Sequence, residues 1–327
     1  MAVISYIDAI TKALREEMER DEKVFVLGED VGKKGGVFKA TAGLYEQFGA
    51  ERVIDTPLAE SAIAGVGVGA AMYGMRPVAE IQFADFILPA VNQIISEAAK
   101  IRYRTNNDWQ CPLVVRAPYG GGVHGALYHS QSLESVFANQ PGLKIVMPST
   151  PYDVKGLLKA AIRDDDPVLF FEHKRAYRLI KGEVPDDDYV LPIGKAEVKR
   201  EGTDITVITY GLCVHFALQA AEKLREDGIE AHILDLRTVY PLDKEAIIEA
   251  AAKTGKVLLV TEDNKEGSII GEVAAIIAEN CLFDLDAPIM RLAGPDVPAM
   301  PYAPPMEKYF MVNPEKVEKA MRELAEF

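Results

Sequence analysis

The sequence contains few cysteines and no long hydrophobic run. Cys111, Cys213 and Cys281 are the only three in 327 residues, and they form neither a CxxC motif nor an even-numbered disulfide framework. Cysteines spaced this widely favour a reducing compartment. No apolar stretch is long enough to cross a membrane, and the first residues carry acids where a signal peptide would carry a basic segment. We therefore expect neither a membrane span nor a signal peptide.

Basic residues are also in short supply. The chain has 36 Lys and Arg against 50 Asp and Glu, which gives a net charge of −14. This balance argues against nucleic acid or an anionic membrane as the main partner, and it leaves room for a basic protein partner. Hydrophobic residues make up 49% and charged residues 26%, as in ordinary globular proteins, and the length suffices for two domains.

Several catalytic motifs are missing. The chain has no GxSxG and no P-loop, so nothing supports a hydrolase or a nucleotide triphosphatase. Gly65, Gly67 and Ala70 do fit G-x-G-x-x-A, but a polar segment precedes them and Glu80 follows too soon. A dinucleotide site needs a hydrophobic strand before the glycines and a later acid. These small residues indicate a helix whose small face permits the close approach of another helix or of a planar ligand.

Short apolar runs alternate with amphipathic segments along the whole chain, which predicts parallel sheets covered on both faces by helices. A polar stretch interrupts the alternation and reads as a linker over 186–204, between domains at 1–185 and 205–327. The fold class is therefore α/β, with two three-layer α/β/α domains. Strands are expected at 24–28, 78–83, 113–118, 144–148, 168–173, 204–211, 231–237, 256–263 and 287–294, and helices at 7–18, 84–104, 152–163, 213–228, 243–255, 271–283 and 313–327.

One acid stands out at the start of the segment DTPLAESAIAGVGVGAAMYG, residues 55–74. Glu60 has no basic neighbour and precedes a run of small residues. It can be a helix-start acid, with Thr56 as the cap and Pro57 at the first helical position. It can also face a pocket in which an aromatic, nitrogen-containing ligand lies against the small residues.

Two further segments leave alternatives open. The glycine-rich stretch GGGVHGALYHSQS, residues 120–132, reads as a functional loop, but a single loop histidine is more often structural than catalytic. His124 and His129 lie five apart, with no Cys or acid nearby to complete a zinc site. Asp164, Asp165 and Asp166 read by default as a solvated turn before a proline.

Several blocks together carry a resemblance to a known family: GEDVGKKGGVFKAT (28–41), DTPLAES (55–61), AEIQFADF (79–86), GALYHSQS (125–132) and DLRTVYPLD (235–243). In this order and over the whole length, the sequence resembles the beta subunit of the thiamine-diphosphate-dependent decarboxylating component of 2-oxo acid dehydrogenase complexes. GALYHSQ and FFEHKRAYR resemble the branched-chain branch more than the pyruvate branch. The resemblance implies a thiamine-diphosphate-binding fold followed by a transketolase C-terminal-like domain.

The resemblance implies roles for particular residues. Glu60 matches the acid that bonds the aminopyrimidine ring and promotes proton loss from the thiazolium carbon; apolar, uncharged surroundings favour the protonated carboxyl that this needs. Phe86 matches an aromatic stacked on the pyrimidine, a position where some branched-chain relatives carry Tyr, and Gln82 and Leu58 line the same site. His129 matches the histidine that helps pass the acyl group to lipoamide, while His124 is structural or faces the substrate. Potassium in relatives is held largely by backbone oxygens, here those of Leu113, Ala161, Ile162, Asp164 and Asp166.

One absence shapes the expected assembly. Thiamine-diphosphate enzymes hold Mg²⁺ and the diphosphate with a GDG…N segment, and this chain has no GDG. The resemblance therefore implies a separate alpha subunit, an α2β2 tetramer, a 2-oxo acid substrate, and the lipoyl and basic subunit-binding domains of a dihydrolipoyl acyltransferase core as partners. We expect bacterial cytoplasm or, in a eukaryote, the mitochondrial matrix. A pyruvate-specific enzyme, a transketolase-like enzyme and a non-catalytic scaffold subunit are the rival interpretations.

Overall fold

The computed structural model describes residues 2–327, which form two compact units. The N-terminal unit contains the chain up to Tyr119 together with Val136–Ile193. The C-terminal unit contains Gly120–Ser135 and Gly194–Phe327. The chain thus passes into the second unit and returns before the predicted linker begins, so the glycine-rich loop belongs by its contacts to the C-terminal unit.

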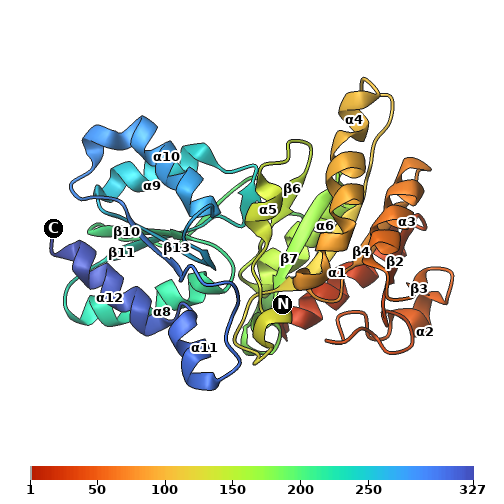
Figure 1. Ribbon diagram of the computed structural model, residues 1–327, viewed down its shortest axis with the longest axis horizontal. Helices are drawn as coiled ribbons and strands as arrows, with labels where there is room; N and C mark the ends of the chain where they lie inside the picture. Colours follow the sequence, from red (N-terminus) through yellow and green to blue (C-terminus); the bar gives the residue numbers. More distant parts are fainter. Residues whose placement is uncertain (1) are drawn as a thin grey trace. The chain divides into compact units, whose positions relative to one another are not determined.

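The N-terminal unit is built on parallel strands (Figure 1). Each strand pairs in parallel with its neighbours. Every residue of β2, β5 and β7 is buried, so helices and loops cover both faces of the sheet, as continuous apolar runs predict. Across the sheet the order is β6 (Lys144–Val146), β7 (Val168–His173), β5 (Val114–Tyr119), β4 (Arg76–Glu80), β2 (Val24–Gly28) and β3 (Val53–Asp55).

The helices of this unit follow the sequence pattern. Helix α1 (Tyr6–Arg20) begins with a capping box between Ser5 and Asp8 and packs against α6 (Pro151–Arg163). Helix α3 (Glu60–Met72) packs on β4. The remaining elements are β1 (Ala2–Ser5), antiparallel to β8 (Lys181–Val184), and the short helices α2 (Leu44–Phe48), α4 (Ile101–Arg104), α5 (Glu134–Ala138) and α7 (Ala176–Leu179).

The single helix expected at 84–104 is wrong. This segment runs through two 3₁₀ turns, Ala84–Phe86 and Leu88–Ala90, then a π-helical stretch and a further 3₁₀ turn before α4. Pro89 explains the break, since it has no N–H to donate and it restricts the preceding residue. Its carbonyl accepts a 2.7 Å hydrogen bond from the Ser61 hydroxyl, which ties the broken segment to α3.

The C-terminal unit has its own sheet. Strands β14 (Met290–Gly294), β13 (Val257–Asn264), β10 (Ile205–Thr209) and β11 (Ala231–Asp235) are parallel, and β9 (Glu197–Arg200) joins the edge antiparallel to β11. In Figure 1, α9 (Lys244–Thr254) and α10 (Ile269–Cys281) lie on one side of the sheet, and α8 (Leu212–Glu226) and α12 (Pro314–Ala325) on the other. The remaining elements are β12 (Thr238–Tyr240) and α11 (Pro304–Phe310).

The strand β9 falls inside the stretch that the sequence predicts as a linker. An edge strand leaves one side open to solvent and carries polar side chains, so its sequence resembles that of a loop. Among residues 2–327, no helix combines the length and apolar character that a membrane crossing requires.

Candidate functional site

Three neighbouring strands bring the predicted cofactor residues to one edge of the N-terminal sheet. Strands β3, β2 and β4 lie side by side and are parallel, so their carboxyl ends meet at the same edge. Glu29 follows β2, Glu60 opens the helix that follows β3, and Gln82 follows β4. Open α/β sheets bind ligands at this edge. The topology thus gathers residues that are far apart in the sequence.

The helix that carries Glu60 begins later than the sequence predicts. Helix α3 starts at Glu60, and Ala59 is the N-cap residue, without a side-chain cap. Thr56 and Pro57 lie outside the helix, so the interpretation of Thr56 as the cap and of Pro57 as the first helical residue is wrong. The Thr56 hydroxyl is buried without a hydrogen-bond partner among the described residues. Glu60 therefore stands half-buried at an uncapped helix N-terminus, where the helix dipole favours a negative charge.

A second carboxylate accompanies Glu60. Partial burial raises the pKa of Glu29, and the negative charges of Asp30 and Glu60 raise it further, against the opposing charge of Lys34. The loop after Glu29 is fixed to the end of β3, since the Gly32 N–H donates to the Asp55 carboxylate at 2.6 Å. Glu29 thus adds a second carboxylate to this edge of the sheet.

Aromatic side chains border the same edge. The rings of Phe83 and Phe86 lie edge to face at 6.0 Å between centroids, and Phe83 meets Phe38 in the same way at 5.3 Å. The ammonium group of Lys174 lies 5.6 Å from the centre of the Phe83 ring. Gln82 and Phe86 are both half-buried, so each presents part of its side chain to solvent. An aromatic surface of this kind suits a flat heterocycle.

A buried ionic network lies behind this edge. The Arg116 guanidinium bonds both carboxylate oxygens of Glu172, at 2.6 and 2.7 Å, and one oxygen of Glu80 at 2.6 Å. The Tyr177 hydroxyl also donates to Glu172, at 2.7 Å. Burial raises the pKa of Glu80, and the Arg116 charge opposes this rise. The network joins β4, β5 and β7 near their carboxyl ends.

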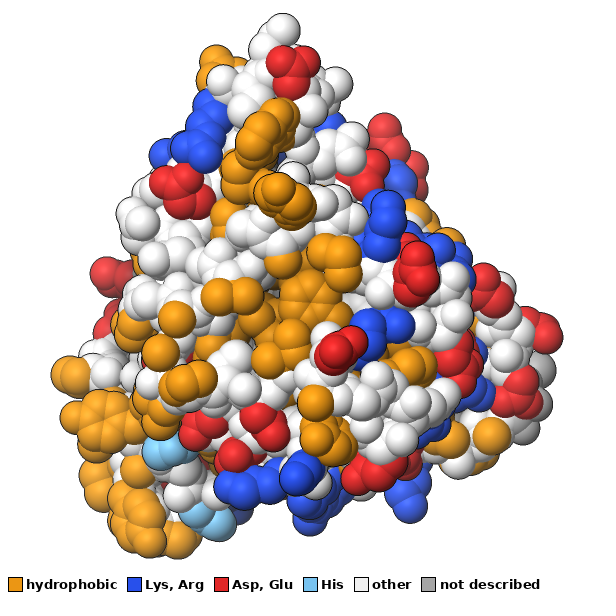
Figure 2. Space-filling view, turned by 90° about the vertical axis from the view of Figure 1, so that its right-hand side faces the viewer, with side chains coloured by type: hydrophobic (Ala, Val, Ile, Leu, Met, Phe, Trp, Pro, Cys, Tyr) orange, Lys and Arg blue, Asp and Glu red, His pale blue; other side chains and the backbone are white. Residues whose placement is uncertain are grey.

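Helix α3 packs on the sheet through small residues and leaves larger apolar residues exposed. A side chain at Gly67 would meet Leu113 at 2.8 Å, so this glycine lets the helix lie close to the sheet. Val66 of α3 is 56% exposed, and Tyr73, the residue that follows the helix, is 95% exposed. Figure 2 shows hydrophobic side chains gathered in the middle of one face with charged side chains at its rim. Leu58 and Leu88, at 70% and 48%, add to the exposed hydrophobic residues near this helix.

The predicted acyl-transfer histidine lies in the loop 120–135. His129 is half-buried and follows a 3₁₀ turn at Ala126–Tyr128. A side chain at Gly125 would stand 2.7 Å from the His129 Cβ and backbone oxygen, so the loop folds tightly onto the histidine. Because this loop belongs to the C-terminal unit, His129 is held by different elements from those that hold Glu60 and Phe86.

The five residues predicted to hold potassium lie at the opposite, amino edge of the N-terminal sheet, around the end of α6. The Ile162 and Asp164 carbonyls accept hydrogen bonds from the Arg76 guanidinium at 3.0 and 2.9 Å. The Ala161 carbonyl accepts from the Asp164 N–H and the Leu113 carbonyl from the Val168 N–H. Carbonyl oxygens at a helix C-terminus are suitable ligands for a cation. Two of these oxygens, those of Ile162 and Asp164, already accept hydrogen bonds from the positively charged Arg76.

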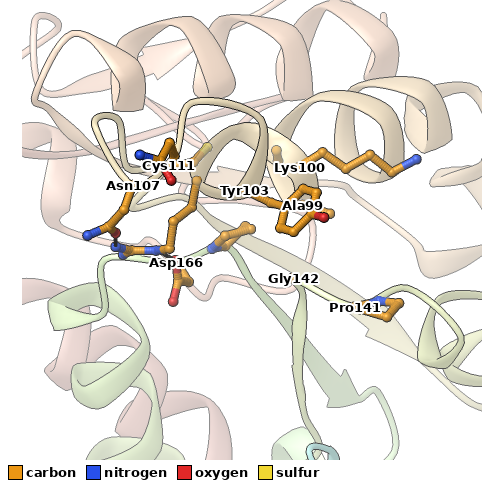
Figure 3. A pocket seen from close by; sticks show the side chains of 12 residues that line it. Ala99, Lys100, Tyr103, Asn107, Cys111, Pro141, Gly142 and Asp166 are labelled. Carbon is orange, nitrogen blue, oxygen red and sulfur yellow. Dashed lines mark hydrogen bonds and ion pairs between the residues drawn. The ribbon is translucent and has the colours of Figure 1, made fainter.

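The last predicted ligand, Asp166, is paired through its side chain. Its carboxylate accepts a 2.5 Å hydrogen bond from Arg102, which also donates to Asn107 at 2.6 Å. Figure 3 shows Asp166, Asn107 and Cys111 on one side of a cavity of about 990 Å³, with Gly142 and Pro141 on another. Burial raises the pKa of the Cys111 thiol to about 12, so this cavity contains no reactive thiolate.

Comparisons with known proteins identify the family. The family model described as "Transketolase, pyrimidine binding domain" matches residues 2–180, and "Transketolase, C-terminal domain" matches residues 194–317. The chain is 86% identical to the 2-oxoisovalerate dehydrogenase subunit beta of Bacillus subtilis (strain 168), over 100% of both chains. It belongs to the family of 2-oxo acid dehydrogenase beta subunits. The predicted family and its branched-chain branch are confirmed.

More distant relatives place this beta subunit within the family. The pyruvate dehydrogenase E1 component subunit beta of Bacillus subtilis (strain 168) is 48% identical over 100% of both chains, and that of Acholeplasma laidlawii is 46% identical over 99% of both. A solved structure titled "Split gene transketolase, inactive beta4 tetramer" matches with a TM-score of 0.81 and 23% identity, covering 99% of this chain and 98% of that one. The predicted α/β fold class is confirmed.

Sequence reasoning missed part of what the beta subunit places around its site. Glu29 lies within a block quoted for the family resemblance, yet its nearness to Glu60 depends on the pairing of β2 with β3. Glu80, Arg116 and Glu172 were also missed. The sequence did contain a signal for them, because each is a charged residue in a short, mostly apolar run, where burial demands a partner.

Proposed function

We propose that this chain is the beta half of a branched-chain 2-oxo acid dehydrogenase, which decarboxylates a branched-chain 2-oxo acid and transfers the acyl group to a lipoyl-lysine. The main support for this proposal is structural. The carboxyl edge of β3, β2 and β4 brings together Glu60, Gln82 and Phe86. The relative at 86% identity supports the branched-chain substrate over pyruvate, whose enzymes match at 48% and below.

The residues at this edge fit thiamine diphosphate. Bound there, the cofactor supplies the nucleophilic carbon that adds to the 2-oxo acid and the electron sink for loss of CO2. Glu60 would exchange a proton with a ring nitrogen of the aminopyrimidine, and the half-buried Phe86 would support the ring face. Gln82 would line the same site, and Leu58, which is 70% exposed, would close over the cofactor.

We propose that the other half of the site belongs to an alpha subunit in an α2β2 tetramer. The chain contains no GDG segment for Mg²⁺ and diphosphate, so the metal would be held mainly by the partner. Exposed apolar residues on and beside α3, among them Val66 and Tyr73, support a partner surface close to Glu60.

We assign His129 to the transfer of the acyl group to lipoamide. An imidazole can deliver a proton near neutral pH, and a loop position leaves space for the long lipoyl arm. The C-terminal unit would then bind the basic subunit-binding domain of the acyltransferase core, in keeping with the net charge of −14.

Potassium is a further proposed ligand, at the turn formed by Ala161, Ile162, Asp164 and Asp166 with Leu113. No group of three or more His, Cys, Asp or Glu side chains within residues 2–327 is arranged to hold a metal ion. A cation at this turn would therefore depend mainly on backbone oxygens, whose second lone pairs stay available beside Arg76. Its role would be structural.

Replacing Glu60 with Gln tests the catalytic assignment. The substitution keeps the size of the side chain and removes its acidity, so turnover should fall by at least about 100-fold in the assembled enzyme. Assembly, followed by sedimentation, should be retained, and Glu51→Gln on the exposed surface of the same unit is the matched control. Unchanged turnover in Glu60→Gln would favour the scaffold interpretation, in which Glu60 only begins a helix.

A further inference from the structure

The loop that carries His129 is fastened at both ends to the C-terminal unit. At its start, the Gly121 N–H donates to the Glu262 carboxylate of β13 at 2.5 Å. A side chain at Gly121 would collide with Met300 at 2.3 Å, so the backbone lies directly on that methionine. At its end, the Ser135 hydroxyl donates to Asp263 at 2.5 Å and the Tyr210 hydroxyl donates to Glu134 at 2.9 Å.

In the middle of the loop, His124 is attached to Glu307 of α11. One carboxylate oxygen accepts the His124 backbone N–H at 3.2 Å, and the other lies 2.6 Å from His124 Nδ1. The Glu307 side chain is 5% exposed, whereas that of His124 is 64% exposed. A buried carboxylate therefore holds a residue whose own side chain is largely exposed.

The held residue has an unusual backbone. His124 adopts a φ of +56° and Ala126 a φ of +51°, in the left-handed region that residues other than glycine seldom enter. Such conformations persist where the surrounding structure enforces them, and they gather at functional sites. Gly125 lies between the two and is packed directly on His129. His124 is therefore joined to His129 through Gly125, whose backbone packs against that histidine.

We infer that Glu307 is a positioning residue for acyl transfer, which acts by holding His124 and so fixing His129. The inference rests on the proposed role of His129. It gives the C-terminal unit a part in the reaction beyond assembly, because Glu262, Asp263 and Glu307 all belong to that unit. Displacing a catalytic group by about 1 Å can lower the rate by on the order of 100-fold. Glu307 affects the second half-reaction, since His129 serves the transfer to lipoamide.

The test uses the enzyme assembled with its alpha subunit, thiamine diphosphate and Mg²⁺, and two rates. The first is reductive acylation of a lipoyl domain, and the second is decarboxylation with an artificial electron acceptor. Glu307→Gln keeps a backbone hydrogen-bond acceptor and loses the charge that faces His124. We expect the first rate to fall by about tenfold or more and the second to change by less than about twofold. Glu279→Gln, an exposed carboxylate on α10, is the control and should change neither.

A second variant keeps the test informative if Glu307→Gln folds poorly. His124→Asn alters an exposed residue, and Asn tolerates the left-handed conformation while lacking the imidazole. We expect the same selective fall, and the double variant should be no worse than either single one, since both remove one contact. Unchanged acyl transfer, additive losses or an equal fall in both rates would overturn the inference. His129→Ala separates the two claims, because acyl transfer that survives this variant defeats the proposed role of His129 itself.

Discussion

The buried network of Arg116 gives the sharpest prediction about the fold beneath the site. Arg116→Met fills similar space but leaves Glu80 and Glu172 buried and facing each other without a counter-charge, at most 5% exposed. Removing one partner of a buried ion pair costs about 3–5 kcal/mol. Tyr177→Phe removes only one hydrogen bond to the Glu172 carboxylate and should cost about 1.5–3 kcal/mol. The arginine variant should therefore lose more stability.

The pH dependence of this loss identifies its cause. Burial raises the pKa of Glu80 in the folded protein, so the stability from this group is present at low pH and is lost as the pH rises through the folded value. Without the Arg116 charge the pKa of Glu80 rises further. The deficit of Arg116→Met relative to the unmodified protein should then be smaller near pH 5 than near pH 8.

Scanning calorimetry measures both effects. We expect the melting temperature of Arg116→Met to fall by roughly 6–20 °C near neutral pH. Arg225→Met, whose side chain is 59% exposed and pairs with Glu222 on α8, is the control and should change stability by less than about 0.5 kcal/mol. A melting temperature within about 2 °C of the original, or a deficit that does not change with pH, would refute this reasoning.

Three further predictions concern other parts of the chain. Burial, together with the charges of Asp263 and Glu262, raises the pKa of Glu134 to about 8, so its stabilising effect is lost as the pH rises towards that value. Glu134→Gln should consequently gain stability relative to the original protein between about pH 5 and pH 8 in thermal melts, and a constant difference would contradict this. Exchanging K⁺ for choline should lower the melting temperature of the assembled enzyme if the turn at Ala161 binds potassium, whereas equal melting temperatures would count against that site. Attachment to the basic domain of the acyltransferase core should weaken by about tenfold or more between about 50 and 300 mM salt in calorimetric titrations, and binding that ignores salt would rule out an electrostatic interface.

The regular elements could be predicted from the sequence because their signals are local. Strands β2 and β7 match the expected ranges 24–28 and 168–173, and α12 begins at a capping Asn313 close to the predicted start. Gly228 and Gly255 end their helices in the left-handed conformation that glycine permits. Such features depend on periodicity and on single capping residues, and both are visible in the sequence.

The remaining features depend on tertiary packing. Periodicity alone could not show that Pro89 divides the segment 84–104, or that β9 pairs at a sheet edge. Glu60 is predicted from the absence of a basic neighbour in the sequence and from the family resemblance, whereas the position of Glu29 depends on the order of β3, β2 and β4. Glu307 and His124 lie 183 positions apart, so no local sequence pattern predicts the hydrogen bond between them.

Reconstitution tests the central claim most directly. The chain would be mixed with a matching alpha subunit, thiamine diphosphate and Mg²⁺, and decarboxylation of branched-chain 2-oxo acids and of pyruvate would be followed with an artificial electron acceptor. We predict activity only in the mixture, fastest with the branched substrates. Full activity of the chain alone would contradict the divided site, and faster turnover of pyruvate would contradict the branched-chain assignment.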